Sequence, residues 1–136
     1  MTRSYSANDV HSTPGYFVLR LSTRSPGVTI SGRSPRLSFG TTKVAAVVGF
    51  PLGANLTETK VFEARQALVD GASELDMVMN VGAFLAGDRN AATDDIEAVV
   101  EAAGDNIVKV IIEITLLSAE GISQAAELVS SAGADF

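Results

Sequence analysis

The sequence contains no cysteine and only one histidine, His11, among its 136 residues. The absence of cysteine excludes a disulfide framework and a thiolate metal site. The single histidine argues against a histidine-based catalytic triad and against a zinc cluster. We therefore expect no metal site.

Long hydrophobic runs are also absent. The longest apolar stretch, residues 44–50, ends at Pro51, far short of the roughly 18 residues that a membrane span needs. The N-terminus has no hydrophobic segment of the signal-peptide type. We expect a soluble, cytoplasmic protein that does not associate with a membrane.

Charge and composition divide the chain into two parts. Residues 1–43 carry six Lys and Arg against one acid, a net charge of +5, and contain fourteen Ser and Thr and three of the four prolines. Residues 44–136 carry four Lys and Arg against fifteen acids, a net charge of −11. Such an asymmetry indicates two segments with different roles or origins.

Residues 1–43 read as a poorly ordered leader, because little of this segment can form a core. Short strands are conceivable near Phe17–Leu21 and Val28–Ile30. A nucleic-acid-binding arm is the competing interpretation. The scattered arginines and few aromatic residues argue against it, so we expect no nucleic-acid partner.

Residues 44–136 alternate between strand and helix patterns. Apolar, β-branched runs predict strands at 44–50, 74–80 and 107–113. Each is followed by a helical pattern, with apolar faces over 61–72, 96–103 and 122–129, and residues 134–136 resemble the start of a fourth strand. About 30 residues per unit is typical of a parallel α/β sheet. A doubly wound sheet and a (β/α)₈ barrel compete, and the absence of a glycine-rich phosphate-binding motif after residue 49 disfavours the former.

Several local features complete this prediction. Asn55 is placed to cap the first helix, and residues 81–88 read as a loop. Lys60, Glu63, Arg65 and Arg89 read as solvated positions.

Four charged residues lie within the predicted strands, Glu74 and Asp76 in one and Lys109 and Glu113 in the next. Because side chains alternate along a strand, Asp76 shares a face with Val78 and Asn80. Lys109 shares a face with Ile111 and Glu113, and the opposite faces are aliphatic and suited to packing on helices. Asp76 and Lys109 should then face the same space from adjacent strands. A structural ion pair and a catalytic pair are equally compatible with this pattern. Asn80 and Glu113 end the strands where barrel enzymes keep their chemistry.

Four segments in order closely resemble the deoxyribose-phosphate aldolase family: GFPLGAN at 49–55, FEARQALVDGASELDMVMNVGAFLAGD at 62–88, VKVIIEITLL at 108–117 and AGADF at 132–136. The resemblance covers essentially all of 44–136. It implies a partial (β/α)₈ TIM barrel of about three β/α units, with 1–43 as an unrelated leader.

The resemblance also implies a function. Family members reversibly cleave 2-deoxy-D-ribose 5-phosphate to acetaldehyde and D-glyceraldehyde 3-phosphate, in deoxyribonucleotide catabolism. They act as class I Schiff-base lyases that need no metal and no organic cofactor. Asp76, in the Glu74-Leu75-Asp76 motif, matches the proton donor and acceptor of the family. Lys109 matches a lysine that supports the polar network of the active site.

This chain departs from the family pattern at both ends. The Schiff-base lysine of the family follows AGADF in a KTSTG-type strand, so no residue of this chain matches it, and the second catalytic lysine is also unmatched. We expect an inactive fragment of marginal stability that self-associates through exposed strand edges. A non-catalytic relic, or an interaction partner that associates through those edges, remains an alternative, as does an unrelated α/β protein.

Overall fold

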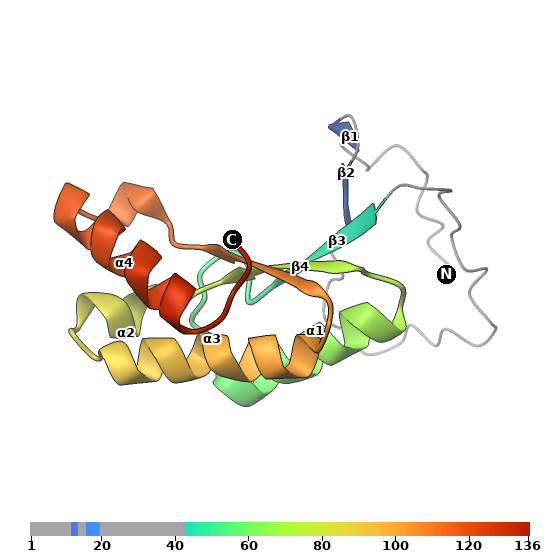
Figure 1. Cartoon of the computed structure of the whole chain (residues 1–136), viewed down its shortest axis with the longest axis horizontal. Coiled ribbons are helices and arrows are strands. Elements are labelled where there is room, and N and C mark those ends of the chain that lie inside the picture. Colours follow the sequence, from blue (N-terminus) through green and yellow to red (C-terminus); the bar gives the residue numbers. More distant parts are fainter. Residues whose placement is uncertain (1–11, 14–15, 20–42) are drawn as a thin grey trace, which may run out of the picture.

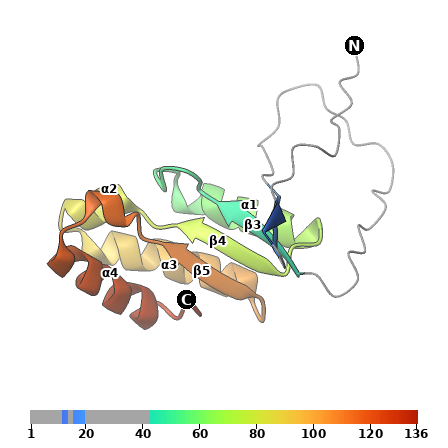
Figure 2. The same cartoon turned by 90° about the horizontal axis from the view of Figure 1, so that it is seen from above.

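The computed structural model describes residues 12–13, 16–19 and 43–136, which form one sheet with helices against it (Figures 1 and 2). The strands are β1 (Ser12–Thr13), β2 (Tyr16–Leu19), β3 (Lys43–Val48), β4 (Glu74–Val78) and β5 (Ile107–Ile111). The helices are α1 (Thr57–Val69), α2 (Val81–Leu85), α3 (Arg89–Ala103) and α4 (Ala119–Ser131), with a 3₁₀ turn η2 at Ile114–Leu116.

The five strands lie in the order in which they occur along the chain, β1-β2-β3-β4-β5. β1 pairs antiparallel with β2, and the pairs β2–β3, β3–β4 and β4–β5 are all parallel. Sequential parallel strands joined by helices on one side are the repeating unit of a barrel rather than of a doubly wound sheet. The predicted fold class, a partial (β/α)₈ barrel, is confirmed.

The three predicted strands are confirmed, each ending two residues earlier than its apolar run. Residues 134–136, expected to start a fourth strand, are not assigned to a strand, but they run beside β5, where the backbone amide of Val110 donates to the carbonyl of Phe136 at 2.8 Å. Within the segment expected to be a leader, residues 16–19 form β2, which agrees with the strand suggested near Phe17. The strand suggested at Val28–Ile30 lies outside the described residues, as does most of the proposed leader.

The helices cover one face of the sheet. α1 and α3 run side by side along it, and α4 lies beside α3 (Figures 1 and 2). The core between the layers includes Leu75, Met77 and Met79 from β4 and its end, and Val108 from β5. These are the aliphatic strand faces that alternation predicts, so the charged faces of β4 and β5 point away from the helices. Among the described residues, no helix is long and apolar enough to cross a membrane.

The segment 81–88 is not a loop, as the sequence pattern suggests, but contains the short helix α2. Asn80 caps this helix, since its side-chain oxygen accepts a hydrogen bond from the amide of Ala83 at 3.0 Å. Asp88 then caps α3 in the same way through the amide of Ala91. Because Asn80 and Asp88 each cap a helix, the segment expected to be a loop forms α2 and leads directly into α3.

The start of α1 also differs from the prediction. Leu56, not Asn55, occupies the N-cap position, and no side chain caps the helix. The buried face of α1 runs through Lys60, Ala64 and Ala67, with Val61 and Leu68 only partly buried. The real face is therefore rotated by about one residue from the expected one, and it includes a lysine.

The loop between β3 and α1 approaches the end of β4 closely. Its Gly53 has a φ of +64°, and a Cβ atom at this position would lie 1.9 Å from the carbonyl oxygen of Met79. Only glycine fits both the left-handed conformation and this contact. The GFPLGAN segment is thus built to lie against the carboxyl end of β4.

Gly53→Ala is expected to destabilise the chain much more than Gly71→Ala. Both glycines have positive φ, but a Cβ atom on Gly71 would meet no other atom within 4 Å, so this position controls for backbone strain alone. The steric overlap at Gly53 should add about 1–3 kcal/mol to the loss in free energy of unfolding, measured by urea denaturation. Equal losses in the two variants would contradict the close contact.

Candidate active site on the strand face away from the helices

Asp76 and Lys109 lie side by side on the strand face that points away from the helices. They are direct partners in the parallel register of β4 and β5, and Oδ1 of Asp76 is 3.4 Å from Nζ of Lys109. The side chains are partly buried, with 23% and 30% exposed. The predicted proximity of the two residues is confirmed. Their catalytic roles remain predictions.

Two further charged residues join this pair, and sequence reasoning missed both. Oε2 of Glu74 accepts a hydrogen bond from Nζ of Lys109 at 2.6 Å, and Oε1 lies 3.3 Å from Nζ of Lys43. Glu74 is 3% exposed, whereas Lys43 is largely exposed. The available signal was the two-residue spacing from Glu74 to Asp76, which places both carboxylates on one strand face. Lys43 was assigned to the leader, although β3 begins with it.

We call these four residues, Lys43, Glu74, Asp76 and Lys109, the charge cluster. The hydrogen bond from Lys109 is the largest influence on Glu74 and lowers the pKa of its carboxyl group, although burial opposes this effect. Burial tends to lower the pKa of the Lys109 ammonium, but Glu74 and Asp76 outweigh burial and raise it. Opposite charges at this range favour the ionised forms of both partners. Lys109 is therefore fully protonated at neutral pH.

Asp76 retains hydrogen-bonding capacity. Its Oδ1 atom is shielded from solvent and accepts no hydrogen bond from any described residue, although Lys109 lies within ion-pair distance. A buried carboxylate oxygen of this kind is costly unless another group engages it. Among the described residues, Asp76 is thus the member of the charge cluster with a buried side-chain oxygen that accepts no hydrogen bond.

The two polar residues at the ends of the strands have local roles. Asn80 caps α2, as described above. Glu113 has a φ of +55° and accepts a hydrogen bond from the hydroxyl of Thr115. Neither contacts the charge cluster through a hydrogen bond between described residues. Among the described residues, no three His, Asp or Glu side chains gather closely enough to hold a metal ion.

The prediction that Lys60 is solvated is wrong. Its side chain is fully buried, and Nζ lies 2.5 Å from Oδ2 of Asp95 on α3, which is also buried.

Glu63, another residue expected to be solvated, is partly buried and accepts a hydrogen bond from the amide of Gly49 at 2.8 Å. Arg65 and Arg89 are exposed as expected. A spacing of one helical turn places Lys60 on the face of Ala64, and Asp95 on the face of Val99, but it does not show that the two charged side chains pair.

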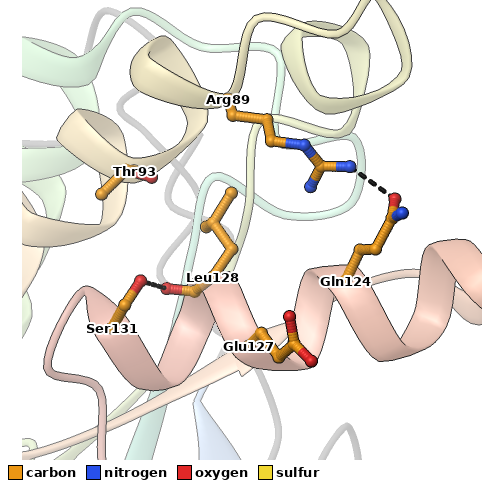
Figure 3. Close-up of a pocket in the computed structure, with 6 residues that line it drawn as sticks. All are labelled: Arg89, Thr93, Gln124, Glu127, Leu128 and Ser131. Carbon is orange, nitrogen blue, oxygen red and sulfur yellow. Dashed lines mark hydrogen bonds between the residues drawn. The ribbon is translucent and has the colours of Figure 1, made fainter.

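A groove lies on the helix side of the molecule, whereas the charge cluster lies on the opposite face of the sheet. It has a volume of about 470 Å³ between α3 and α4 (Figure 3) and is lined by Arg89, Thr93, Gln124, Glu127, Leu128 and Ser131. Its arginine is already engaged, because it donates to Gln124 at 2.5 Å and lies over the ring of Phe84. The groove contains no group from the charge cluster.

Parallel β/α units, with acid and lysine side chains on the strand face away from the helices, define this chain as part of a (β/α)₈-barrel protein. In such barrels that face becomes the interior, and the carboxyl ends of the strands carry the chemistry. Comparison with known proteins specifies the class further. The model of the DeoC/LacD family aldolases matches residues 25–136, and the chain belongs to this family.

Individual relatives agree with this assignment. Deoxyribose-phosphate aldolase from Streptococcus uberis is 54% identical over 94 residues, which cover 69% of this chain and 43% of the relative. Among solved structures, QR15, an aldolase, superposes with a TM-score of 0.70 at 40% identity, covering 73% of this chain and 45% of the other. The tetrameric deoxyribose phosphate aldolase of Aeropyrum pernix superposes with a TM-score of 0.62 at 34% identity, covering 70% and 40%.

The chain therefore spans less than half the length of the relatives that it matches. The family match begins at residue 25, upstream of the boundary that composition predicts at residue 44. The part that the structure describes from residue 43 onward includes the charge cluster and the loop that approaches β4.

Glu74→Gln is expected to lower stability by about 2 kcal/mol at neutral pH, because it removes a charge-assisted hydrogen bond. The folded-state pKa of Glu74 lies below its ordinary value of 4.5. The contribution of Glu74 is therefore fully present above pH 4.5 and is lost as the pH falls through the folded pKa. Urea denaturation from pH 7 to 3 should show the wild-type chain and the variant converging in acid.

The matched control is Glu101→Gln, which changes an exposed glutamate on α3. It should leave both the stability and its dependence on pH close to those of the wild-type chain. A constant difference between wild type and Glu74→Gln down to pH 3 would show that the ionised form of Glu74 is not what stabilises the fold.

Proposed function

We propose that this chain carries part of the active site of a deoxyribose-phosphate aldolase, which cleaves 2-deoxy-D-ribose 5-phosphate to acetaldehyde and D-glyceraldehyde 3-phosphate. Family membership and 54% identity to a curated enzyme of that name support this substrate. The observation that carries the proposal is the position of Asp76, whose partly exposed side chain lies on the barrel-interior face, 3.4 Å from Nζ of Lys109.

Asp76 is assigned the proton transfer. Aldol cleavage breaks the bond between the α and β carbons of a carbonyl compound. The hydroxyl on the β carbon loses a proton, and the α carbon, which becomes the carbanion, gains one. A carboxylate within reach of both sites, directly or through water, can serve as general base and then general acid. The ammonium group of Lys109 lies 3.4 Å from Oδ1 of Asp76, on the strand face that becomes the barrel interior.

Lys109 is assigned a supporting role and not that of the nucleophile. An amine attacks a carbonyl only when it is unprotonated, so a Schiff-base lysine needs a depressed pKa. The pKa of Lys109 is instead raised by Glu74 and Asp76. Its ammonium group can hold Asp76 in place and balance negative charge during the reaction.

The other two lysines of the chain are no better arranged for attack. Lys60 is buried in an ion pair with Asp95, away from the charge cluster. Lys43 lies 3.3 Å from Glu74 at the start of β3, at the end of the strand opposite to the one where barrel chemistry takes place. We therefore propose that the 136-residue chain forms no Schiff base by itself, and that the nucleophile of the complete site is supplied by sequence that this chain does not contain.

Self-association is the second component of the proposal. The described sheet ends in β1 on one side and is bordered by only residues 135–136 on the other. Unpaired backbone groups at sheet edges favour association with another strand. A chain that associates without catalysing the reaction is the alternative function, and a cytoplasmic location is proposed together with the aldolase function.

The function is tested by grafting residues 43–136 in place of the matching segment of the Streptococcus uberis aldolase. The graft should release acetaldehyde from 2-deoxyribose 5-phosphate, and Asp76→Asn within it should lower kcat by about 10²-fold or more. Asp94→Asn, an exposed carboxylate on α3, is the control and should leave kcat unchanged. A folded graft with no activity would favour the non-catalytic alternative, and an active graft indifferent to Asp76→Asn would refute the role of Asp76.

The absence of a nucleophile is tested on the 136-residue chain. Incubation with acetaldehyde and borohydride at pH 7 should label Lys109 no more than the background of lysine labelling, because the ammonium form of Lys109 cannot add to the carbonyl. Heat-denatured chain provides the background level of lysine labelling. A stoichiometric adduct mapped to Lys109 by peptide mass spectrometry would contradict the supporting role given to this residue.

A further inference from the structure

Lys60 and Asp95 form a fully buried ion pair on the helix side of the sheet, apart from the charge cluster. Nζ of Lys60 lies 2.5 Å from Oδ2 of Asp95, with side chains that are 0% and 1% exposed. The hydroxyl of Thr57 donates to the other oxygen, Oδ1, at 2.9 Å. A buried ion pair is often no more stabilising than apolar side chains of similar volume. Stability alone therefore does not explain why charges occupy this position.

Lys60 has a second partner, which links it to the candidate active site. Its ammonium group donates to the carbonyl oxygen of Val78 at 3.0 Å. Val78 is the last residue of β4 and lies two residues beyond Asp76 on the same strand. Lys60 therefore holds the carboxyl end of the strand that carries Asp76, while Asp95 fixes the direction of the lysine.

Glu63, one turn further along α1, holds the neighbouring strand. Its Oε2 atom accepts a hydrogen bond from the amide of Gly49, immediately after β3, at 2.8 Å. A Cβ atom on Gly49 would lie 2.9 Å from Cε of Lys60, so the lysine side chain passes directly beside this glycine. One helix thus contacts the ends of β3 and β4 through two side chains of opposite charge.

The loop that follows β3 depends on both contacts. Gly53 donates to the carbonyl of Gly49 at 2.8 Å, and its own backbone lies against the carbonyl of Met79. The loop therefore extends from the residue held by Glu63 to the strand end held by Lys60. It exposes Phe50 and Leu52, 51% and 73% accessible, at the edge where barrel proteins bind their substrates.

We propose that Lys60, Asp95 and Glu63 are positioning residues that fix the carboxyl ends of β3 and β4, so that loop 49–55 forms a wall of the substrate site next to Asp76. The inference that loop 49–55 is held in place rests on the contacts of Lys60 and Glu63 described above. The role of the loop as a wall of the substrate site rests on the proposed aldolase function. A side chain that only cancelled a buried charge would not need to contact Val78.

The experiment separates positioning from stability by hydrogen exchange of the full 136-residue chain. Three variants are compared with wild type: Lys60→Met, the double variant Lys60→Met/Asp95→Leu, and Glu63→Ala. Urea denaturation gives global stability. Exchange is followed in peptides that cover residues 49–55 and 78–82, with α4 as the reference for global opening.

Lys60→Met alone should lose stability, because it leaves the Asp95 carboxylate buried without its partner. The double variant should recover that stability, since both charges are gone. Exchange in residues 49–55 and 78–82 should nevertheless stay about tenfold faster than in wild type, with α4 unchanged, because the contact with Val78 is still missing. Recovery of loop protection together with stability would overturn the proposal, since the pair would then be only structural.

If the double variant does not recover stability, Glu63→Ala distinguishes a positioning role from a purely structural one. Faster exchange confined to residues 49–55, with α4 protection unchanged, supports positioning. A uniform change across the chain, or no change in the loop, overturns it. Because exchange requires no catalysis, failure of the aldolase assay leaves this result intact, and failure here leaves the aldolase assignment intact.

Discussion

The parallel pairing of β4 with both of its neighbours is the constraint on which the rest of the structure depends. β4 aligns Asp76 with Val47 on one side and with Lys109 on the other. A shift of register by one residue would turn every side chain of the strand to the opposite face. Leu75 and Met77 would then leave the core, and the carboxylates of Glu74 and Asp76 would face the helices without partners.

Charge burial is balanced separately on the two sides of this strand. On the face away from the helices, Glu74 is held between Lys43 and Lys109. On the helix side, Lys60 is held by Asp95 and by a carbonyl of β4 itself. Each buried charge has an opposite charge within 3.3 Å, which offsets the cost of removing it from water. The two networks meet at β4, because Glu74 lies on one face of this strand and Lys60 donates to the carbonyl of Val78 from the other.

Much of the fold and part of the site could be predicted from local patterns. Apolar runs located β3, β4 and β5, and two-residue alternation placed Asp76 and Lys109 together, because both signals arise within single elements. The face of α1 was misplaced by about one residue. Lys60 was assigned to solvent, since a lysine next to Val61 and Ala64 looks exposed until its partner on another helix is known. Asn80 was read as a strand end, although its side chain begins α2.

The sequence by itself determined the alternation of strands and helices, the strand faces that bear charge and the resemblance to aldolases. Each of these follows from residue type and spacing along the chain. Only the tertiary structure decided which charges pair. Glu74 meets Lys109 across 35 residues of sequence, and Lys60 meets Asp95 across the same separation. Such contacts depend on how β/α units stack, and electrostatic attraction acts over a few ångströms in space regardless of distance along the chain.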